Sequence, residues 1–188
     1  MYTSKDIKTI FTHQLKNNRV VDYSGRINYL VRIEKWINKH RKDIIDAHYL
    51  DLGKPESETE LAEIWYVLSE IKIAKNNLKK WMRPKKVGQS TLALLTARSW
   101  LHYEPRGVVL IISPWNFPFN LTIGPLVSAL ASGNRIIIKP SEFSPNVSSL
   151  IEKMINENFK SKRVALIKGE NTVAKELLKY PFDHIFFT

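Results

Sequence analysis

The chain has 188 residues, 44% of them apolar and 25% charged, which suits a soluble globular chain of one or two small domains. It contains no cysteine, which excludes a disulfide framework, a thiol nucleophile and a thiolate metal site within these residues. Histidines are present without the spacing of metal ligands, so no metal site is expected.

The N-terminal residues carry charges and lack the apolar core, about 7–15 residues long, of a secretory signal. No run approaches the roughly 18 apolar residues of a membrane span, so we expect a cytoplasmic chain. The net charge is +11, and basic residues are concentrated between residues 72 and 86. A solvated face is the favoured interpretation of that run. Nucleic-acid binding is the weaker alternative, because the aromatic-rich patterns of RNA-binding modules are missing.

Residues 1–90 predict a helical region. Apolar residues at helical spacing indicate a short helix over residues 4–17, a break at residues 23–25, and a longer helix over residues 26–50. The S-x-x-E pattern at residues 57–60 is a capping box, which predicts the start of a third helix there.

A β-hairpin is predicted after the helical region. Residues 83–90 form a basic linker that contains proline. Residues 92–95 and 99–104 are short β-like segments around a turn at residues 96–98. The predicted hairpin therefore occupies residues 91–104.

A βαβ unit follows the hairpin. Residues 108–112 and 136–138 are β-branched apolar runs without polar alternation, as expected for strands covered on both faces. The roughly 20 residues between them are enough for a right-handed crossover helix.

The same alternation of strands and helices continues to the last residue of the sequence. Ser144 and Pro145 begin a helix, residues 164–167 form a third strand, Asn171 begins a short helix, and residues 184–188 form a fourth strand. The fold class is therefore α/β: a helical N-terminal region, a hairpin, and a partial doubly wound parallel sheet over residues 105–188. An apolar strand normally needs a covering helix after it, so the sequence looks cut at this point.

The loop after the first strand carries a candidate catalytic residue, because ligands in open α/β sheets bind outside the carboxyl ends of the strands. Asn116 lies in Pro-Trp-Asn-Phe-Pro, where the prolines restrict the backbone on both sides. A side-chain amide fixed in this way can stabilise a developing oxyanion. The alternative is an Asx-turn that only supports the loop.

The second strand ends in Lys139-Pro140-Ser141-Glu142. The Glu142 carboxylate can accept hydrogen bonds from ribose hydroxyls, and Lys139 adds donors and positive charge. The alternative is an ordinary lysine at a strand end with Glu142 on a solvated turn. The G-x-G-x-x-G fingerprint is absent after the first strand, so any dinucleotide must be held differently from a conventional Rossmann fold.

The chain resembles the aldehyde dehydrogenase superfamily in four segments: PWNFPF, LTIGPLVSALASGN, IIIKPSE and FDHIFFT. The sequences of these segments are similar to the class 3 branch of that superfamily. The resemblance runs from about residue 24 to residue 188. The combination of PWNFP with KPSE about 20 residues later is specific, and it favours functional roles for Asn116 and Glu142.

The resemblance implies NAD(P)-dependent oxidation of an aldehyde to a carboxylic acid. In the family a cysteine thiolate attacks the aldehyde, a loop asparagine that matches Asn116 holds the oxyanion, and a glutamate activates water. The residues that match Lys139 and Glu142 hold the adenosine ribose. The wall of the cofactor cleft in the family matches Ile112, Ser113 and Trp115. A glycine near the adenine matches Gly169.

The family's remaining catalytic parts have no match in this sequence. The Gly-Ser loop, the general-base glutamate, the nucleophilic cysteine and a strand of the oligomerisation sheet all follow the segment that matches Thr188. We therefore expect the N-terminal portion of a class 3-like aldehyde dehydrogenase that is inactive alone, with a second polypeptide supplying the catalytic half.

The alternative to an enzyme part is a non-catalytic relic, or a cofactor-binding module that self-associates through its uncovered last strand as a homo-oligomer. NAD is the expected cofactor, because Glu142 beside a ribose 2′-hydroxyl would repel a 2′-phosphate. Neighbouring lysines could offset that repulsion, so NADP stays open.

Overall fold

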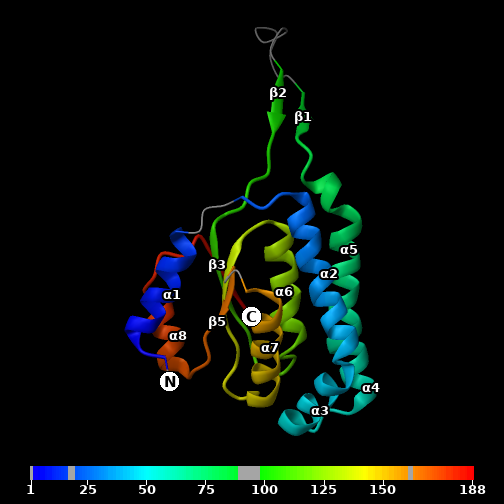
Figure 1. Ribbon diagram of the computed structural model, residues 1–188, viewed down its shortest axis with the longest axis vertical. Helices are drawn as coiled ribbons and strands as arrows, with labels where there is room; N and C mark the ends of the chain where they lie inside the picture. Colours follow the sequence, from blue (N-terminus) through cyan, green and yellow to red (C-terminus); the bar gives the residue numbers. More distant parts are fainter. Residues whose placement is uncertain (1, 17–19, 89–97, 161–162) are drawn as a thin grey trace.

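The computed structural model describes residues 2–16, 20–88, 98–160 and 163–188 (Figure 1). Its first part is helical and ends in a hairpin: α1 (Ser4–Lys16), α2 (Tyr23–Lys39), α3 (Arg41–Leu52), α4 (Glu56–Thr59), the π-helical segment η1 (Glu60–Trp65), α5 (Tyr66–Trp81), β1 (Lys85–Val87) and β2 (Ser99–Leu101). Strands and helices then alternate: β3 (Val108–Ile112), α6 (Asn120–Ala131), β4 (Arg135–Lys139), α7 (Pro145–Asn158), β5 (Val164–Leu166), α8 (Asn171–Leu177) and β6 (His184–Phe187).

The main sheet is parallel, with the strand order β5-β4-β3-β6. In its register Ile112 is paired with Lys139 on one side and with Phe187 on the other. The strands therefore end together at one edge of the sheet. This arrangement confirms the predicted α/β fold and its βαβ unit.

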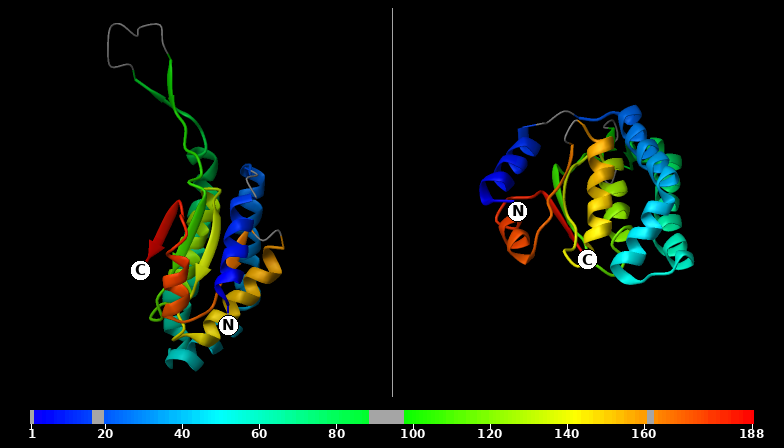
Figure 2. Two further views of the ribbon diagram at one scale, coloured as in Figure 1. Left: turned by 90° about the vertical axis from the view of Figure 1, so that its left-hand side faces the viewer. Right: turned by 60° about the horizontal axis from the view of Figure 1, so that its bottom comes forward.

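Alternate residues of β3 face two different cores. Val109 and Ile111 belong to a large core that includes residues of α2, α5, α6 and α7. Val108 and Leu110 pack in a second core with residues of α1 and α8. Figures 1 and 2 show these layers, with α1 and α8 on one side of the sheet and the other helices on the opposite side. The edge strand β6 is different, since all four of its residues are exposed.

Three predicted helix boundaries were wrong. The break at residues 23–25 is the first turn of α2, because the Asp22 side chain accepts a hydrogen bond of 2.9 Å from the Gly25 N–H and caps the helix. The single helix over residues 26–50 is two helices, α2 and α3, which meet at His40. The capping box at residues 57–60 is not formed, because α4 already begins after Pro55.

The hairpin differs from its prediction in its first strand. Lys86 pairs with Trp100 in an antiparallel ladder, so β1 lies within the predicted linker. The predicted strand over residues 92–95 lies outside the described residues. The two strands extend away from the rest of the structure beyond α5 (Figure 1). The domain boundaries at residues 90 and 104 stay predictions.

The described residues contain neither a membrane-spanning helix nor a cluster of metal ligands. None of the helices there is long and apolar enough to cross a membrane. Over the same residues, no group of three or more histidine, cysteine or acidic side chains is arranged to hold a metal ion.

Gly107 provides a test of how β3 and β6 are held together. Its φ is +134°, and a Cβ built on it would overlap the Asp183 carboxylate. That carboxylate accepts a hydrogen bond of 2.7 Å from the Val108 N–H, at the start of β3. We expect Gly107→Ala to lower the free energy of unfolding by at least about 1–3 kcal/mol in urea denaturation, because it adds strain and displaces Asp183.

Gly88→Ala is the matched control, because no atom of the described residues lies within 4 Å of a Cβ built on Gly88, and its φ is not positive. It should change the free energy of unfolding by less than about 0.5 kcal/mol. Equal effects of the two substitutions would contradict this account of Gly107.

Candidate functional site

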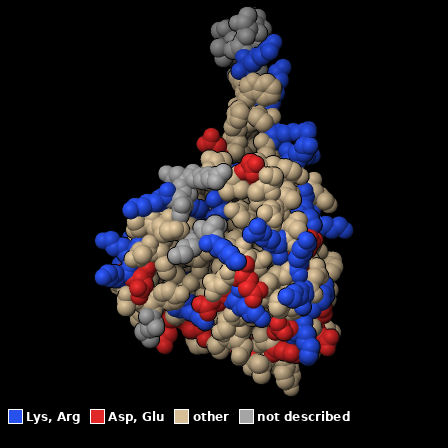
Figure 3. All heavy atoms as spheres, in the orientation of Figure 1, with Lys and Arg blue, Asp and Glu red and all other residues tan. Residues whose placement is uncertain are grey.

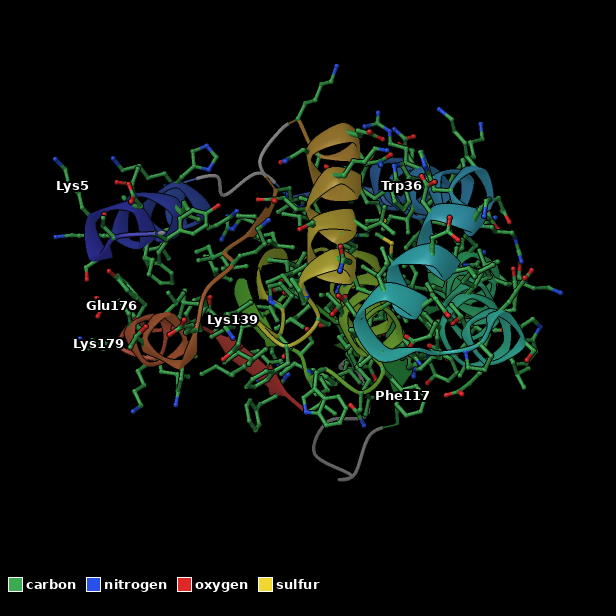
Figure 4. The ribbon with its side chains drawn as sticks, turned by 90° about the horizontal axis from the view of Figure 1, so that it is seen from below. Lys5, Trp36, Phe117, Lys139, Glu176 and Lys179 are labelled. Atoms are coloured by element: carbon green, nitrogen blue, oxygen red, sulfur yellow. The ribbon has the colours of Figure 1, made fainter. Side chains whose placement is uncertain are left out.

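The loops after β3 and β4 begin side by side. The Ser113 N–H donates to the Lys139 carbonyl at 3.2 Å, which extends the pairing of the two strands by one bond. Ser113 Oγ also accepts a hydrogen bond of 2.7 Å from Thr122 Oγ1 on α6. Figure 4 looks at the molecule from this end, where Lys139 and Phe117 are labelled.

Asn116 lies in the loop between β3 and α6, and it is exposed. Within the described part of the chain, its side-chain amide makes no hydrogen bond. The Asx-turn alternative is not formed, and Pro118, two residues further on, has no N–H to donate to such a turn. The amide is therefore available to donate to a ligand.

The backbone of Asn116, by contrast, is held firmly. Lys54 donates from Nζ to the Asn116 carbonyl at 3.0 Å, and the same ammonium lies 4.2 Å from the centre of the Phe117 ring. Lys54 is 7% exposed and forms an ion pair of 2.7 Å with Glu63 Oε1. A buried lysine from the segment between α3 and α4 thus contacts the peptide group that follows the candidate oxyanion donor.

Glu63 lies in η1 and is fully buried. Its Oε2 accepts a hydrogen bond of 2.8 Å from the Asn120 N–H, at the start of α6. The Asn120 side chain in turn donates to the Ala62 carbonyl at 2.9 Å. Since α6 has no side-chain cap of its own, Glu63 serves that purpose from a different helix.

His48 completes the surroundings of Glu63. Its Nε2 lies 3.3 Å from Glu63 Oε1, and its Nδ1 lies 2.7 Å from the Ile44 carbonyl, so Nδ1 carries a proton. Burial by itself raises the pKa of Glu63. The contact with His48 and the hydrogen bonds from Lys54 and the Asn120 N–H outweigh burial and hold the pKa of Glu63 below its ordinary range. Glu63 is therefore a carboxylate at neutral pH.

Lys139 and Glu142 form the second part of the site. Lys139 is buried, and its Nζ donates to Glu142 Oε2 at 2.5 Å. Burial alone raises the pKa of Glu142. The hydrogen bond and the charge of Lys139 lower it by more than burial raises it, so the pKa of Glu142 lies below its usual range. The Glu142 side chain stays 28% exposed, so this carboxylate can accept hydrogen bonds from a ligand.

The other predicted site residues lie along the same edge. Ile112 and Ser113 are buried at the end of β3, and Trp115 is 53% exposed in the following loop. Gly169 follows β5, which pairs with β4, and its backbone lies against Val173 at a φ of +157°. The structure therefore brings all the predicted residues to one edge of the sheet, while their individual roles stay predictions.

Two side chains of the basic run between residues 72 and 86 have partners on other segments. Figure 3 shows lysines and arginines spread over this face and along the hairpin, with acidic residues among them. Lys75 is paired with Glu34 at 2.6 Å, and Lys85 lies 5.1 Å from the centre of the Tyr103 ring. Nucleic-acid binding stays the weaker hypothesis.

Residues 7–188 match the model of the aldehyde dehydrogenase family. The chain belongs to this family. It is 41% identical over 183 residues to the 4,4'-diaponeurosporen-aldehyde dehydrogenase of Staphylococcus aureus, covering 97% of this chain and 39% of that one. It is 38% identical to aldehyde dehydrogenase family 3 member I1 of Arabidopsis thaliana, covering 95% and 33%.

The structure is also similar to a solved member of the family, the substrate-bound state of Staphylococcus aureus AldH. The TM-score is 0.92 at 38% sequence identity, and the match covers 100% of this chain and 41% of that chain. The chain thus corresponds to the N-terminal portion of its aldehyde dehydrogenase relatives and spans about two fifths of their length or less.

Sequence reasoning missed Lys54, Glu63 and His48. One signal was available: Glu63 precedes Val67 by four residues and so shares its buried face of the helix. A carboxylate on an apolar helix face indicates a partner elsewhere in the fold.

The lowered pKa of Glu63 predicts how the stability of this network depends on pH. Glu63→Gln should cost about 3–5 kcal/mol at pH 7, because it leaves the buried Lys54 without its counter-charge. The folded-state pKa of Glu63 is below its unfolded value of about 4.3, so the contribution is present above that pH and is lost as pH falls through the folded pKa. Urea denaturation should therefore show the gap between wild type and Glu63→Gln closing in acid.

Glu58→Gln is a matched control for this measurement. Glu58 lies 3.8 Å from the same Lys54 Nζ but is half exposed, so its loss should cost less than about 1 kcal/mol. A gap for Glu63→Gln that stayed constant down to the acid transition would contradict the assigned carboxylate.

Proposed function

We propose that this chain supplies the oxyanion-binding and cofactor-binding part of an NAD(P)-dependent aldehyde dehydrogenase. The observation that carries the proposal is the placement of Asn116 and the Lys139–Glu142 pair on neighbouring loops at the carboxyl edge of one sheet. Membership of the family supports it.

Asn116 would act on the aldehyde. As a nucleophile adds to the carbonyl carbon, negative charge develops on the oxygen, and the Asn116 Nδ2–H donates a hydrogen bond to it. An amide donor of this kind contributes about 2.7–4 kcal/mol of transition-state stabilisation in acyl-transfer enzymes. The thiolate nucleophile must come from outside these residues, which contain no cysteine, so we propose that they are inactive alone.

Lys139 and Glu142 fit the ribose of a nicotinamide cofactor. A ribose diol offers hydroxyls that both donate and accept, and this pair presents a charged carboxylate acceptor beside an ammonium donor. Ile112, Ser113 and Trp115 would line the cleft, with Gly169 near the adenine. When bound, the cofactor supplies the acceptor for the aldehyde hydride.

A second polypeptide with the catalytic half would pack against the exposed edge of the sheet at β6. A groove of about 830 Å³ lies there between α5, α6 and β6, lined in part by Tyr66, Ile73, Trp81 and Phe186. These large side chains are all exposed. Exposed apolar surface of this kind favours a partner of matching apolar character. We propose a cytoplasmic location for this enzyme.

Complementation tests the proposed function. The chain would be co-expressed with the part of the Staphylococcus aureus AldH that it does not match, and NADH formation would be followed at rising aldehyde concentration. We expect turnover that neither piece gives alone. Asn116→Ala should then lower kcat by about 10²–10³-fold, because the oxyanion loses its donor.

Asn156→Ala is the control for this substitution, because Asn156 is exposed on α7 and far from the loop in sequence. It should leave kcat unchanged. Absence of turnover in the mixture would contradict the split-enzyme proposal, whereas turnover unaffected by Asn116→Ala would contradict only the role of Asn116.

Cofactor preference gives an independent test on the assembled enzyme. Glu142→Gln removes the charge that would repel a 2′-phosphate, so the ratio of NADP to NAD affinity should rise by about tenfold, or about 1.4 kcal/mol. Titration calorimetry with each cofactor measures this ratio. Glu176→Gln is the control, because Glu176 forms a similar i,i+3 pair with Lys179 away from the strand loops. An unchanged ratio in Glu142→Gln would place Glu142 outside the ribose site.

Self-association is the second candidate function, and β6 is the observation that favours it. The strand lies at the sheet edge, and Ile185, Phe186 and Phe187 are exposed. Such an edge can pair with another copy of the chain as a homo-oligomer. Light scattering on the purified chain, combined with the complementation assay, distinguishes the two candidate functions. A monomer that gains activity on complementation supports the split enzyme. A stable oligomer that resists complementation supports the self-associating module.

A further inference from the structure

We propose that Lys54 and Glu63 are positioning residues that fix the direction of the Asn116 amide. The inference deepens the proposed function, since it rests on the role of Asn116 as the oxyanion donor. Neither residue lies near Asn116 in sequence, and both belong to the helical region rather than to the strand loops.

The contact with Lys54 falls on the peptide group next to the Asn116 Cα. Because a peptide group is planar, fixing the Asn116 carbonyl oxygen fixes the plane that joins Asn116 to Phe117. Lys54 Nζ holds that oxygen at 3.0 Å and also lies over the Phe117 ring. The backbone from which the exposed amide projects therefore has one direction, while the amide itself stays available.

Glu63 fixes both Lys54 and the far end of the loop. Its two oxygens are divided between the Lys54 ammonium at 2.7 Å and the Asn120 N–H at 2.8 Å. The near end of the loop is held by Ser113, whose N–H is bonded to the Lys139 carbonyl. The loop is thus tied at its start, in its middle and at its end, and the middle tie is the one made by Lys54.

Stability alone is a weak explanation for this arrangement. A buried ion pair often contributes little more than an apolar pair of the same volume, because both charges must leave water. A lysine that only filled space would not need an acceptor on the loop backbone. An apolar replacement of Lys54 cannot reproduce the hydrogen bond to the Asn116 carbonyl.

The Asn116 carbonyl can be observed directly by NMR. The sequence contains Asn-Phe at only two places, residues 116–117 and 158–159. Labelling asparagine carbonyls with ¹³C and phenylalanine amides with ¹⁵N therefore gives two signals in an HNCO spectrum of the full chain. The Asn158 signal is an internal control, because its carbonyl accepts a hydrogen bond from Arg32 of α2 and not from Lys54.

The informative variant is the double substitution Lys54→Met with Glu63→Gln. It replaces the buried ion pair with a neutral pair of similar volume, and the glutamine carbonyl can still accept from the Asn120 N–H. We expect its midpoint of urea denaturation to lie closer to wild type than that of Lys54→Met alone. The Asn116 carbonyl signal should nevertheless move upfield or split, because its hydrogen-bond donor is gone, while the Asn158 signal stays in place.

Lys54→Arg is the conservative variant, and it should keep the Asn116 signal near its wild-type position because it keeps a charged donor. An unchanged Asn116 signal in the double variant, or equal shifts of both signals, would overturn the proposal. Failure of the double variant to fold would also overturn it, since the pair would then be needed for the fold as a whole. None of these readouts uses catalysis, so failed complementation would reject the proposed function without affecting them.

Discussion

A buried carboxylate, Glu63, adds a polar link between the helical region and the α/β region of this chain. Glu63 has no exposed surface, and a charge in that position is costly unless donors surround it. Lys54 and the Asn120 N–H donate to it, and His48 lies beside it. Two of these neighbours come from the helical region, and the third begins the crossover helix of the sheet. The helical layer and the α/β layer are therefore joined by polar contacts at the edge where the strands end.

The location of the candidate site follows from the register of the sheet. Because Ile112 is paired with Lys139, the two loops that follow β3 and β4 leave the sheet together. A shift of the register would separate Asn116 from Glu142, although neither side chain takes part in the sheet. The chemistry thus depends on strand pairing that is set by the apolar runs inside the sheet, and those runs face cores on both sides.

The sequence predicted the features that are encoded locally. The strands β3 and β4 are short runs of β-branched residues, and Asn116 and Glu142 lie within a few residues of them, so pattern and topology were sufficient. The start of α2 was missed although its cap is local, because Asp22 precedes a Ser-Gly pair that resembles a turn. The bond from Lys54 to Asn116 spans 62 residues, and no local pattern reports a contact of that range.

The two parts of the site are built in the same way. In each, a buried lysine holds a group that faces outward: Lys54 holds the backbone of the exposed Asn116, and Lys139 holds the partly exposed carboxylate of Glu142. Burial keeps each ammonium close to its acceptor, since water cannot compete for it. The outward group is then fixed in direction without losing its own capacity to bind. In this arrangement the contacts that fix each group and the contacts that would bind a ligand use different atoms. The site can therefore present one donor and one acceptor to a ligand while both are held in place.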